Sequence, residues 1–343
     1  MCGLASLFLV FFCGMKSSTQ AAMPVLILPT DNQAILQGGP DFYMYVDRSF
    51  EGESTKPWEG GKFGYVRNPV RQGDRLIMSR FHGGIDIKPL RRDASNEPLD
   101  EVRSIADGTV VYVSDNPRDS NYGRYLVVEH IWDGCRFYSL YAHLNKTSVT
   151  AGQSVPAGTV LGRLGYTGAG INKERSHLHL ELVMMMNAQY ADYFPTVVKD
   201  SSNKHGVFNG MNLMSMDIAR LYLEQHKNPS ITFQQFVEQE TVFYRVIVPG
   251  EQRPEILDRH PWLARGAPTG GSPPSWEVSF TQWGLPVRIT PSTRKVTEPV
   301  VSAIRQSTAP YTYYTSGKIS GSGPAPTLTP RGERHVRQFT FPN

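Results

Sequence analysis

The sequence predicts a mainly β protein, with an antiparallel β-sheet domain followed by a mixed α/β C-terminal extension. The chain of 343 residues is long for one core, which indicates a main domain with an accessory region. Its 31 Gly and 25 Pro favour short strands joined by turns over a helical bundle. Residues 81–186 are dense in such strands, and helix signals begin only after them.

The individual strand predictions rest on β-branched and aromatic runs bounded by turn residues. Residues 108–113 follow the turn residue Asp107 and form the first such run. Residues 125–130 and 136–142 are two further runs joined through Trp132-Asp133-Gly134, which predicts a hairpin. Short strands punctuated by glycine are expected at 152–155 and 158–162, and residues 177–183 close the set.

Helix signals follow this strand-rich region. Ser215 is expected to cap a helix that runs to about Lys227. Thr232 and Gln235 fit a capping box at the start of a second helix. Residues 266–275 are rich in Gly, Pro and Ser, which indicates a linker, and strands are expected again over residues 276–289.

These patterns divide the chain into segments. An apolar run at residues 4–12, followed by small residues, predicts a secretory signal at residues 1–22. No later segment could span a bilayer, so the mature protein is expected to be exported, to the periplasm or the cell exterior. The other segments are an N-terminal segment packing on or near the main domain at 23–80, the main β domain at 81–190, a helical extension at 191–265, the linker at 266–275 and a C-terminal β-rich or α+β region at 276–343.

Charge and cysteine content exclude two classes of protein. The net charge of +4 is mild, and no basic cluster is interleaved with aromatic residues, so nucleic acid is not an expected partner. Cys2 and Cys13 fall in the predicted signal, which leaves Cys135 alone and the mature chain without an internal disulfide. Cys135 itself is expected to be buried in a strand.

Three separated motifs carry histidine and aspartate in a pattern typical of a metal site. They are His82-Gly83-Gly84-Ile85-Asp86, Tyr141-Ala142-His143-Leu144 and His177-Leu178-His179. A catalytic zinc ion takes three protein ligands and leaves the fourth position for water. The two glycines of the first motif disfavour a helix, so a compact turn is expected to aim His82 and Asp86 at one point.

The closing strand separates the roles of its two histidines. His177, His179 and Glu181 share one face, and the intervening leucines share the other face and should pack inward. Neighbouring side chains on one face lie roughly 6.5–7 Å apart, which is too far for both histidines to bind one ion without strain. One is therefore expected to bind the metal while the other reaches its water, and the spacing does not say which.

Several other side chains allow both a functional and a structural interpretation, or only a structural one. Glu181 either orients a metal ligand from behind or is a solvated strand residue. Tyr141 shares the expected face of His143 and could assist at an oxyanion, although an ordinary aromatic strand residue is favoured. The remaining downstream histidines lack matching partners and are expected at the surface: His205, His226, His260 and His335.

The order of these motifs resembles the M23 peptidases, the lysostaphin- and LytM-like zinc endopeptidases that cut peptide bridges in peptidoglycan. Between the second and third motifs lies a run that this family also shows: Gly152, Val155, Gly158, Leu161-Gly162, Gly165, Thr167 and Gly168. The resemblance covers roughly residues 81–186. It implies a β-sheet scaffold of the duplicated-hybrid-motif type, with a narrow groove and the metal on its floor.

By this resemblance His82, Asp86 and His179 would bind one zinc ion, and His143 and His177 would be the catalytic pair. One of the pair would activate water, and the other would stabilise the oxyanion or protonate the leaving amine. The implied protein is an exported endopeptidase acting on peptide cross-links or bridges of peptidoglycan. A D,D cross-link is favoured over a glycine bridge because nothing in the chain resembles a wall-targeting module.

The chain also departs from the family pattern. Residues 88–100 and 170–175 lengthen two loops that should flank the groove and affect substrate preference. The C-terminal third has no counterpart in the minimal family domain and could bind an envelope protein partner.

Two other functions are open alternatives. One is a non-catalytic M23-like regulator or activator of cell-wall amidases, although the five metal and catalytic positions are intact. The other is a binding module with a structural zinc ion, which would need a fourth protein ligand.

Overall fold

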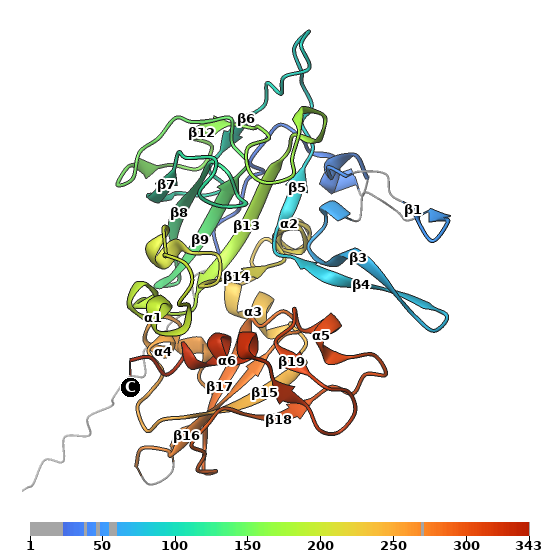
Figure 1. Ribbon diagram of the computed structural model, residues 1–343. Coiled ribbons are helices and arrows are strands. Elements are labelled where there is room, and N and C mark those ends of the chain that lie inside the picture. The colour runs from blue at the N-terminus through green and yellow to red at the C-terminus, as the bar shows by residue number, and fades with distance from the viewer. Residues whose placement is uncertain (1–22, 38–39, 46–48, 55–59, 269–270, 343) are drawn as a thin grey trace, which may run out of the picture.

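The computed structural model describes residues 23–37, 40–45, 49–54, 60–268 and 271–342. The predicted signal at residues 1–22 lies outside the described residues. A large β-sheet occupies the upper part of Figure 1 and a smaller one the lower part, with short helices between them. No helix in the described part of the chain is long and apolar enough to cross a bilayer.

The larger sheet has seven strands and contains those predicted at residues 108–113, 125–130, 136–142, 152–155 and 177–183, whereas the strand predicted at 158–162 lies in a separate three-stranded sheet. In spatial order its path is β11 (Ser154–Val155), β7 (Gly108–Ser114), β8 (Tyr125–Trp132), β9 (Cys135–Ala142), β13 (Leu178–Met185) and β14 (Leu213–Met216), with β5 (Ile85–Ile87) paired to β13. All its strand pairs are antiparallel. The prediction of a mainly β, antiparallel domain is therefore confirmed.

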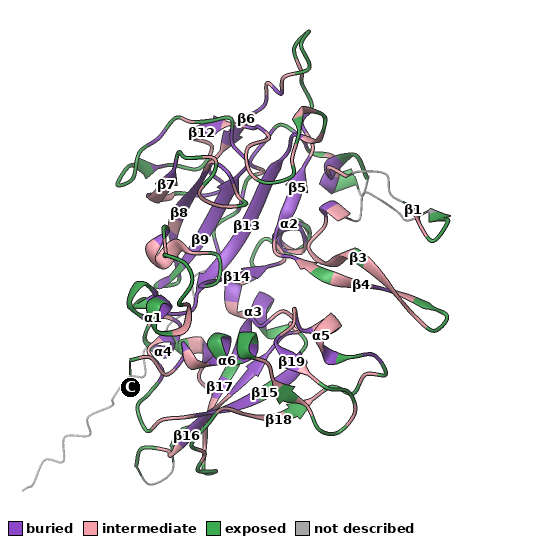
Figure 2. Ribbon diagram, in the orientation of Figure 1, coloured by how far each residue is buried: buried purple, intermediate pink, exposed green. Residues whose placement is uncertain are grey.

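The predicted hairpin is β8–β9, and its turn follows from two residues. Asp133 and Gly134 both have positive φ, 49° and 72°, which matches the twist of the strands they connect. The core lies against one face of this sheet, where Leu178, Leu180 and Leu182 are fully buried as predicted. Figure 2 shows β8, β9 and β13 as mostly buried ribbons, so the other face of the sheet is also covered.

Smaller sheets surround this one. The long hairpin β3–β4 projects to the right in Figure 1, and its second strand ends at His82. The bounds of these strands are β1 (Ser49–Phe50) with β2 (Glu53–Ser54), β3 (Gly64–Gln72) with β4 (Arg75–His82), and β6 (Glu101–Arg103), β10 (Lys146–Thr147) and β12 (Val160–Arg163) in a three-stranded sheet.

The region after residue 190 contains both helices and strands. Its sheet has the order β17 (Pro286–Ser292), β16 (Ser275–Phe280), β15 (Tyr244–Pro249) and β18 (Val300–Ile304), followed by the pair β19 (Ile319–Ser320) and β20 (Thr327–Leu328). Its helices are α1 (Tyr190–Val197), α2 (Ile218–Lys227), α3 (Phe233–Glu238), α4 (Ile256–Arg259), α5 (Tyr311–Tyr314) and α6 (Pro330–Arg337). Strand β15 precedes residues 266–275 in the chain, and it pairs with β16, which begins at the last residue of that segment, and with β18 beyond it.

Short 3₁₀ helices complete the described elements. They are η1 (Ala34–Gln37), η2 (Pro40–Phe42), η4 (Lys173–Arg175), η5 (Gly206–Phe208) and η6 (Pro261–Leu263).

One predicted helix cap is correct and one is wrong. Thr232 and Gln235 form the expected capping box of α3. Ser215 instead lies in β14, and α2 is capped by Asp217, whose side chain accepts a hydrogen bond of 3.0 Å from the backbone N–H of Arg220. The sheet extends two residues further than the local pattern indicates, because β14 is paired along its length with β13.

Three of the four downstream histidines are buried, so the expectation that they lie at the surface is wrong for them. His205, His260 and His335 are 9%, 0% and 6% exposed, whereas His226 is exposed as expected. Two of the buried rings find partners far away in sequence: Tyr112 Oη lies 2.8 Å from Nδ1 of His205, and Gly284 O lies 2.8 Å from Nε2 of His335. Cys135 is buried and free, as predicted.

Candidate metal centre

Strand pairing brings the first and third histidine motifs together. Asp86 on β5 lies directly opposite His179 on β13 in the antiparallel register. His82 ends β4, so only the Gly83-Gly84 turn separates it from β5. The sequence expectation of a compact turn leading into a strand is confirmed.

Both glycines in this turn are required by close packing. A Cβ on Gly84 would lie 2.4 Å from the carbonyl oxygen of Leu180, and one on Gly83 would lie 2.6 Å from Oγ of Ser215. A side chain at position 84 would therefore push the turn away from the backbone of β13, and one at position 83 would displace the hydroxyl that bonds Glu181. The glycines let the turn carry His82 and Asp86 against the strand that holds His179.

Three ligand atoms converge at one point. Nε2 of His82 lies 3.0 Å from Nδ1 of His179 and 3.1 Å from Oδ1 of Asp86, and the last two atoms are 2.9 Å apart. Three ligands at about 2.0–2.1 Å from a tetrahedral ion are separated by roughly 3.3 Å, so this triangle is close to the size that zinc requires. All three side chains are buried, and together they form a cluster able to hold a metal ion.

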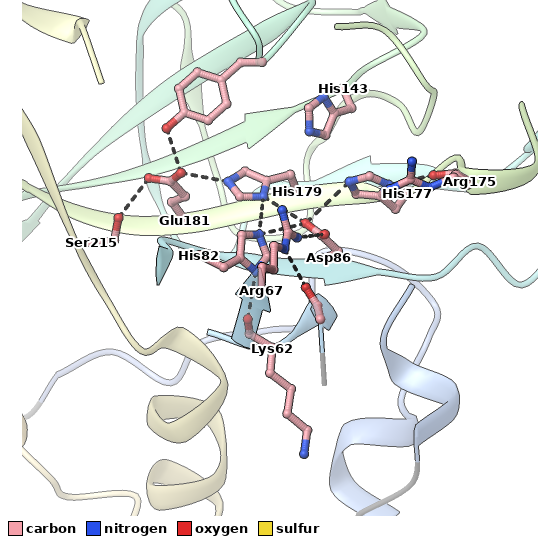
Figure 3. Close-up of polar contacts among 12 residues, drawn as sticks. Lys62, Arg67, His82, Asp86, His143, Arg175, His177, His179, Glu181 and Ser215 are labelled. Carbon is pink, nitrogen blue, oxygen red and sulfur yellow. Dashed lines mark hydrogen bonds and ion pairs between the residues drawn. The ribbon is translucent and has the colours of Figure 1, made fainter. Parts of the chain in front are cut away.

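Hydrogen bonds on the far side of each ring fix which nitrogen faces the cluster. Nδ1 of His82 lies 2.7 Å from the carbonyl oxygen of Lys62, and Nε2 of His179 lies 2.7 Å from Oε1 of Glu181. Both partners are acceptors, so these nitrogens carry protons, and the opposite nitrogens are the ones that would direct a lone pair at a metal ion. Figure 3 shows this arrangement, in which the residues present fit a divalent metal ion.

The electrostatics of the cluster favour a cation. Burial lowers the pKa of His179, but its hydrogen bonds to Asp86 and Glu181 outweigh burial and raise the pKa to about 9. Burial acts to raise the pKa of Asp86, and the neighbouring imidazoles of His177 and His82 overcome it, so the carboxyl pKa lies well below its usual value. The same two carboxylates that favour a proton on His179 would favour a metal ion at its Nδ1.

His143 and His177 lie beside the cluster with their ring centroids 4.8 Å apart. Nδ1 of His143 is 2.8 Å from the carbonyl oxygen of Thr167, and Nδ1 of His177 is 2.7 Å from that of Arg175. Nε2 is thus the free nitrogen of each ring, and in His177 it lies 3.4 Å from Oδ1 of Asp86. Burial is the main cause that lowers the pKa of both imidazoles, which therefore favour the neutral form.

The structure thus brings all five sequence-predicted site residues together. The two histidines of the HLH motif take different positions relative to the three-residue cluster. His179 contributes an atom to the three-residue cluster, whereas His177 precedes β13 and lies next to that cluster. His143 follows β9 with φ of 62°, a left-handed conformation that breaks the strand alternation. As a result Tyr141 does not share its face: Tyr141 is in the main core, where its hydroxyl accepts the N–H of Ile105.

Glu181 is buried and not solvated. Of the two interpretations of this residue, the structure supports the one in which its carboxylate orients His179. Glu181 is 4% exposed, and Oε1 accepts hydrogen bonds from His179 and from the hydroxyl of Tyr122 at 2.7 Å each. Oε2 accepts a hydrogen bond of 3.0 Å from the hydroxyl of Ser215. These three hydrogen bonds fix the orientation of the carboxylate toward His179.

Sequence reasoning missed a basic residue from outside the main domain. Arg67 on β3 donates from Nη2 to Oδ2 of Asp86 at 2.5 Å, and its Nε donates to the carbonyl oxygen of Gly60 at 2.8 Å. Its position depends on the pairing of β3 with β4, and no local pattern around Arg67 marks it. Tyr122, in the loop before β8, and Ser215, on β14, were also missed, because their contacts with Glu181 are long-range and no local pattern marks them.

A groove of about 1590 Å³ runs past the cluster. It is lined on one side by the β3–β4 hairpin, with Arg67 and Arg80, and on the other by the loops around residues 119–122 and 200–211. Residues 170–171 and Arg175 also line it, in agreement with the expected position of that loop. Residues 88–100 do not line it; they pack against the other loop, where Glu97 and Lys173 form an ion pair of 2.7 Å.

Two buried histidines and an aspartate at ligand distance, with two more imidazoles beside a groove, define the class of a candidate metallohydrolase. Residues 80–192 match the model of peptidase family M23. The resemblance to this family is therefore confirmed for that segment of the chain. A search of curated proteins found no match.

Solved structures similar to this chain include three peptidases. A zinc-containing peptidase from Vibrio cholerae is 24% identical, with a TM-score of 0.28, over 48% of this chain and 37% of that one. The catalytic domain of the antimicrobial peptidase lysostaphin from Staphylococcus simulans is 26% identical, with a TM-score of 0.25, over 36% and 82%. A mutant catalytic domain of the prophage-encoded M23 protein EnpA from Enterococcus faecalis is 21% identical, with a TM-score of 0.25, over 40% and 79%. The chain thus spans little more than a third of the first of these proteins.

Proposed function

We propose that this chain is an exported zinc-dependent endopeptidase that hydrolyses peptide cross-links or bridges of bacterial peptidoglycan. The observation that carries the proposal is the triangle of ligand atoms from His82, Asp86 and His179, about 3 Å on each side, with two further imidazoles next to it. The match of residues 80–192 to family M23 supports the substrate class. Export rests on the predicted signal at residues 1–22.

His82, Asp86 and His179 would hold the zinc ion. A bound zinc ion supplies Lewis acidity, which polarises a carbonyl oxygen and lowers the pKa of water. Arg67 engages Oδ2 of Asp86, so Asp86 presents the single oxygen Oδ1 to the cluster. Glu181 accepts the ring proton of His179, which makes Nδ1 of that ring a stronger donor of its lone pair.

His143 and His177 would handle the protons of the reaction. Because a carbonyl oxygen holds the Nδ1 proton of each ring, Nε2 accepts a proton when the ring is neutral and donates it when the ring is charged. Such a pair can take a proton from the attacking water as the C–O bond forms. It can return a proton to the amide nitrogen as the C–N bond breaks, which leaves a carboxylic acid and an amine.

The first test is removal of His143. Because His143 contributes no atom to the metal cluster, we expect His143→Ala to keep bound zinc nearly unchanged. Cleavage of purified sacculi should fall at least about 100-fold, the lower end of what a positioned acid–base group contributes. The exposed His226 offers the matched control, since His226→Ala should cleave at the wild-type rate. Cleavage by His143→Ala at the wild-type rate would overturn the catalytic role.

The two alternative functions predict different outcomes. A regulator or activator of amidases would release no soluble muropeptides from sacculi on its own, yet would stimulate a partner amidase. A structural zinc site would need a fourth protein ligand, and the cluster found among the described residues has three. Mass spectrometry of the released muropeptides would distinguish a D,D cross-link, which we favour, from a glycine bridge.

A further inference from the structure

Trp283 connects the C-terminal region to the candidate metal centre. It lies in the turn between β16 and β17, about two hundred residues after the ligand His82 along the chain. Its indole packs against the main hydrophobic core in the company of Phe63 from the N-terminal segment, at a ring distance of 5.3 Å. Two separate contacts lead from this indole toward metal ligands.

The first contact is through the ring face. The indole of Trp283 stacks on Phe81, with ring centroids 5.4 Å apart and ring planes within 9° of parallel. Phe81 immediately precedes His82 on β4 and also packs edge-on against Phe63, with centroids 5.1 Å apart. Such aromatic pairs restrict the orientation of both rings. Trp283 therefore limits how far the end of β4, and with it His82, can shift.

The second contact is through the indole N–H. Nε1 of Trp283 donates a hydrogen bond of 2.8 Å to the backbone carbonyl of Ser215 on β14. The hydroxyl of Ser215 donates to Oε2 of Glu181, whose Oε1 accepts the ring proton of His179. Figure 3 shows Ser215, Glu181 and His179 in this order. The indole N–H thus anchors the residue that orients the carboxylate behind His179.

The turn that carries Trp283 is itself held in place. The carbonyl oxygen of Trp283 accepts a hydrogen bond of 2.7 Å from Nζ of Lys318, and that of Gly284 lies 2.8 Å from Nε2 of His335. Lys318 and His335 are each 6% exposed. A turn fixed by two buried donors can transmit the position of the C-terminal sheet to the residues it touches.

We propose that Trp283 is a positioning residue through which the C-terminal region holds His82 and His179 in metal-binding geometry. The inference rests on the proposed metal site. On this account the region after residue 190 belongs to the same functional unit as the M23 segment, since two of its three ligands are supported from there. The third ligand, Asp86, is held by Arg67 of β3, which engages its outer oxygen.

The test measures the zinc affinity of full-length protein by competition with a chromogenic chelator. Trp283→Phe keeps a ring to stack on Phe81 and loses the N–H, whereas Trp283→Ala loses both contacts. Substituting a residue that contacts a metal ligand changes metal affinity by about 10–100-fold. Trp283 contacts neighbours of the ligands and not the ligands themselves, so its effect should be smaller. We expect the zinc dissociation constant to rise about threefold for Trp283→Phe and about tenfold for Trp283→Ala. Zinc in excess should restore most of the cleavage activity.

Controls separate positioning from general folding. Trp262 lies in the same region and packs on Phe233 and His260, so Trp262→Phe should leave zinc affinity within about twofold of wild type. In a Ser215→Ala background the effect of Trp283→Phe should shrink, because the hydroxyl link to Glu181 is already lost.

Unchanged zinc affinity in Trp283→Phe and Trp283→Ala, with wild-type protein binding zinc and cleaving sacculi, would overturn this inference alone. Wild-type protein that binds no zinc would overturn the proposed function as well.

Discussion

His260 shows how strongly burial can set the behaviour of one residue. It is fully buried and packs against Phe137 and Trp262, with ring centroids 5.3 Å and 5.9 Å away. Neither ring nitrogen has a hydrogen-bond partner among the described residues. Burial, followed by the charge of Arg259, lowers the pKa of His260 to about 3. The folded protein therefore binds fewer protons at this position than the unfolded chain, whose histidine pKa is about 6.5.

This difference predicts acid sensitivity of folding. The stability that neutral His260 contributes is present above pH ~6.5 and is lost as the pH falls toward 3. Between pH 7.5 and 5.5 the loss should be about 1.4 kcal/mol, one pKa unit of differential proton binding. Urea unfolding at pH 7.5 and pH 5.5 measures this loss in the free energy of unfolding. The loss should be about 1.4 kcal/mol smaller in His260→Phe than in the wild type.

The exposed His226 provides the comparison for this prediction. His226→Phe is the same substitution at an exposed position, so it measures what the loss of a histidine away from the core does to stability. Equal losses in wild type and His260→Phe would contradict the account of His260.

Which site residues the sequence reveals depends on how local their relationship is. His82 and Asp86 share one turn, and His177, His179 and Glu181 alternate along one short segment, so together with His143 their pattern predicts a metal site. Arg67, Tyr122 and Ser215 reach the site only through the pairing of distant strands, and nothing around them in the chain marks them. For the same reason three histidines expected at the surface are buried against partners that the sequence does not indicate.

At the scale of single elements, the start of α2 shows how tertiary pairing overrides a local signal. Ser215 has the residue type of a helix cap, but β14 continues through Met216 because it pairs with β13. The helix then starts at Ile218, with Asp217 as its cap. Near its other end, Gln225 of α2 accepts the backbone N–H of Leu26 at 2.9 Å, so the helix also holds the N-terminal segment.

Removal of the true cap should cost stability. Asp217→Ala leaves the N–H of Arg220 without its side-chain acceptor, and we expect the free energy of unfolding to fall by about 1 kcal/mol, the usual value for a lost cap. Urea denaturation would measure the change. Asp192→Ala, at an exposed position in the first turn of α1, should change it by less than about 0.5 kcal/mol. Equal effects of the two substitutions would contradict the assignment of the cap.

Turns and caps that depend on residues close together in the chain could be predicted from the sequence. The irregular backbone conformation at the end of a strand could not. The β8–β9 turn and the capping box of α3 depend on residues within a few positions of one another. The left-handed conformation of His143 reverses the expected alternation after β9, and no glycine or asparagine there indicates it. That single dihedral angle separates His143, which faces the site, from Tyr141, which faces the core.

At the scale of the whole molecule, the composition of residues 266–275 predicts a linker, yet strand pairing joins the regions on either side. Strand β15 lies before this segment and pairs with β16, which begins at its last residue, and with β18 beyond it. A truncation at the segment would remove both neighbours of β15, so the role of the C-terminal region is better tested by point variants such as those at Trp283. The mixed α/β content of this region and strands within residues 276–289 were predicted, but the topology of its sheet was not, because its contacts are long-range and no motif constrains them.

The central claim is that side chains from β4, β5 and β13 meet at a single metal ion, and the zinc content of the purified full-length chain tests it most directly. After dialysis against metal-free buffer, elemental analysis should find about one zinc ion per wild-type chain. Asp86→Ala and His179→Ala each remove one atom of the three-residue cluster and should retain almost none. Equal zinc content in the wild type and these two variants, or none in any of them, would contradict the account.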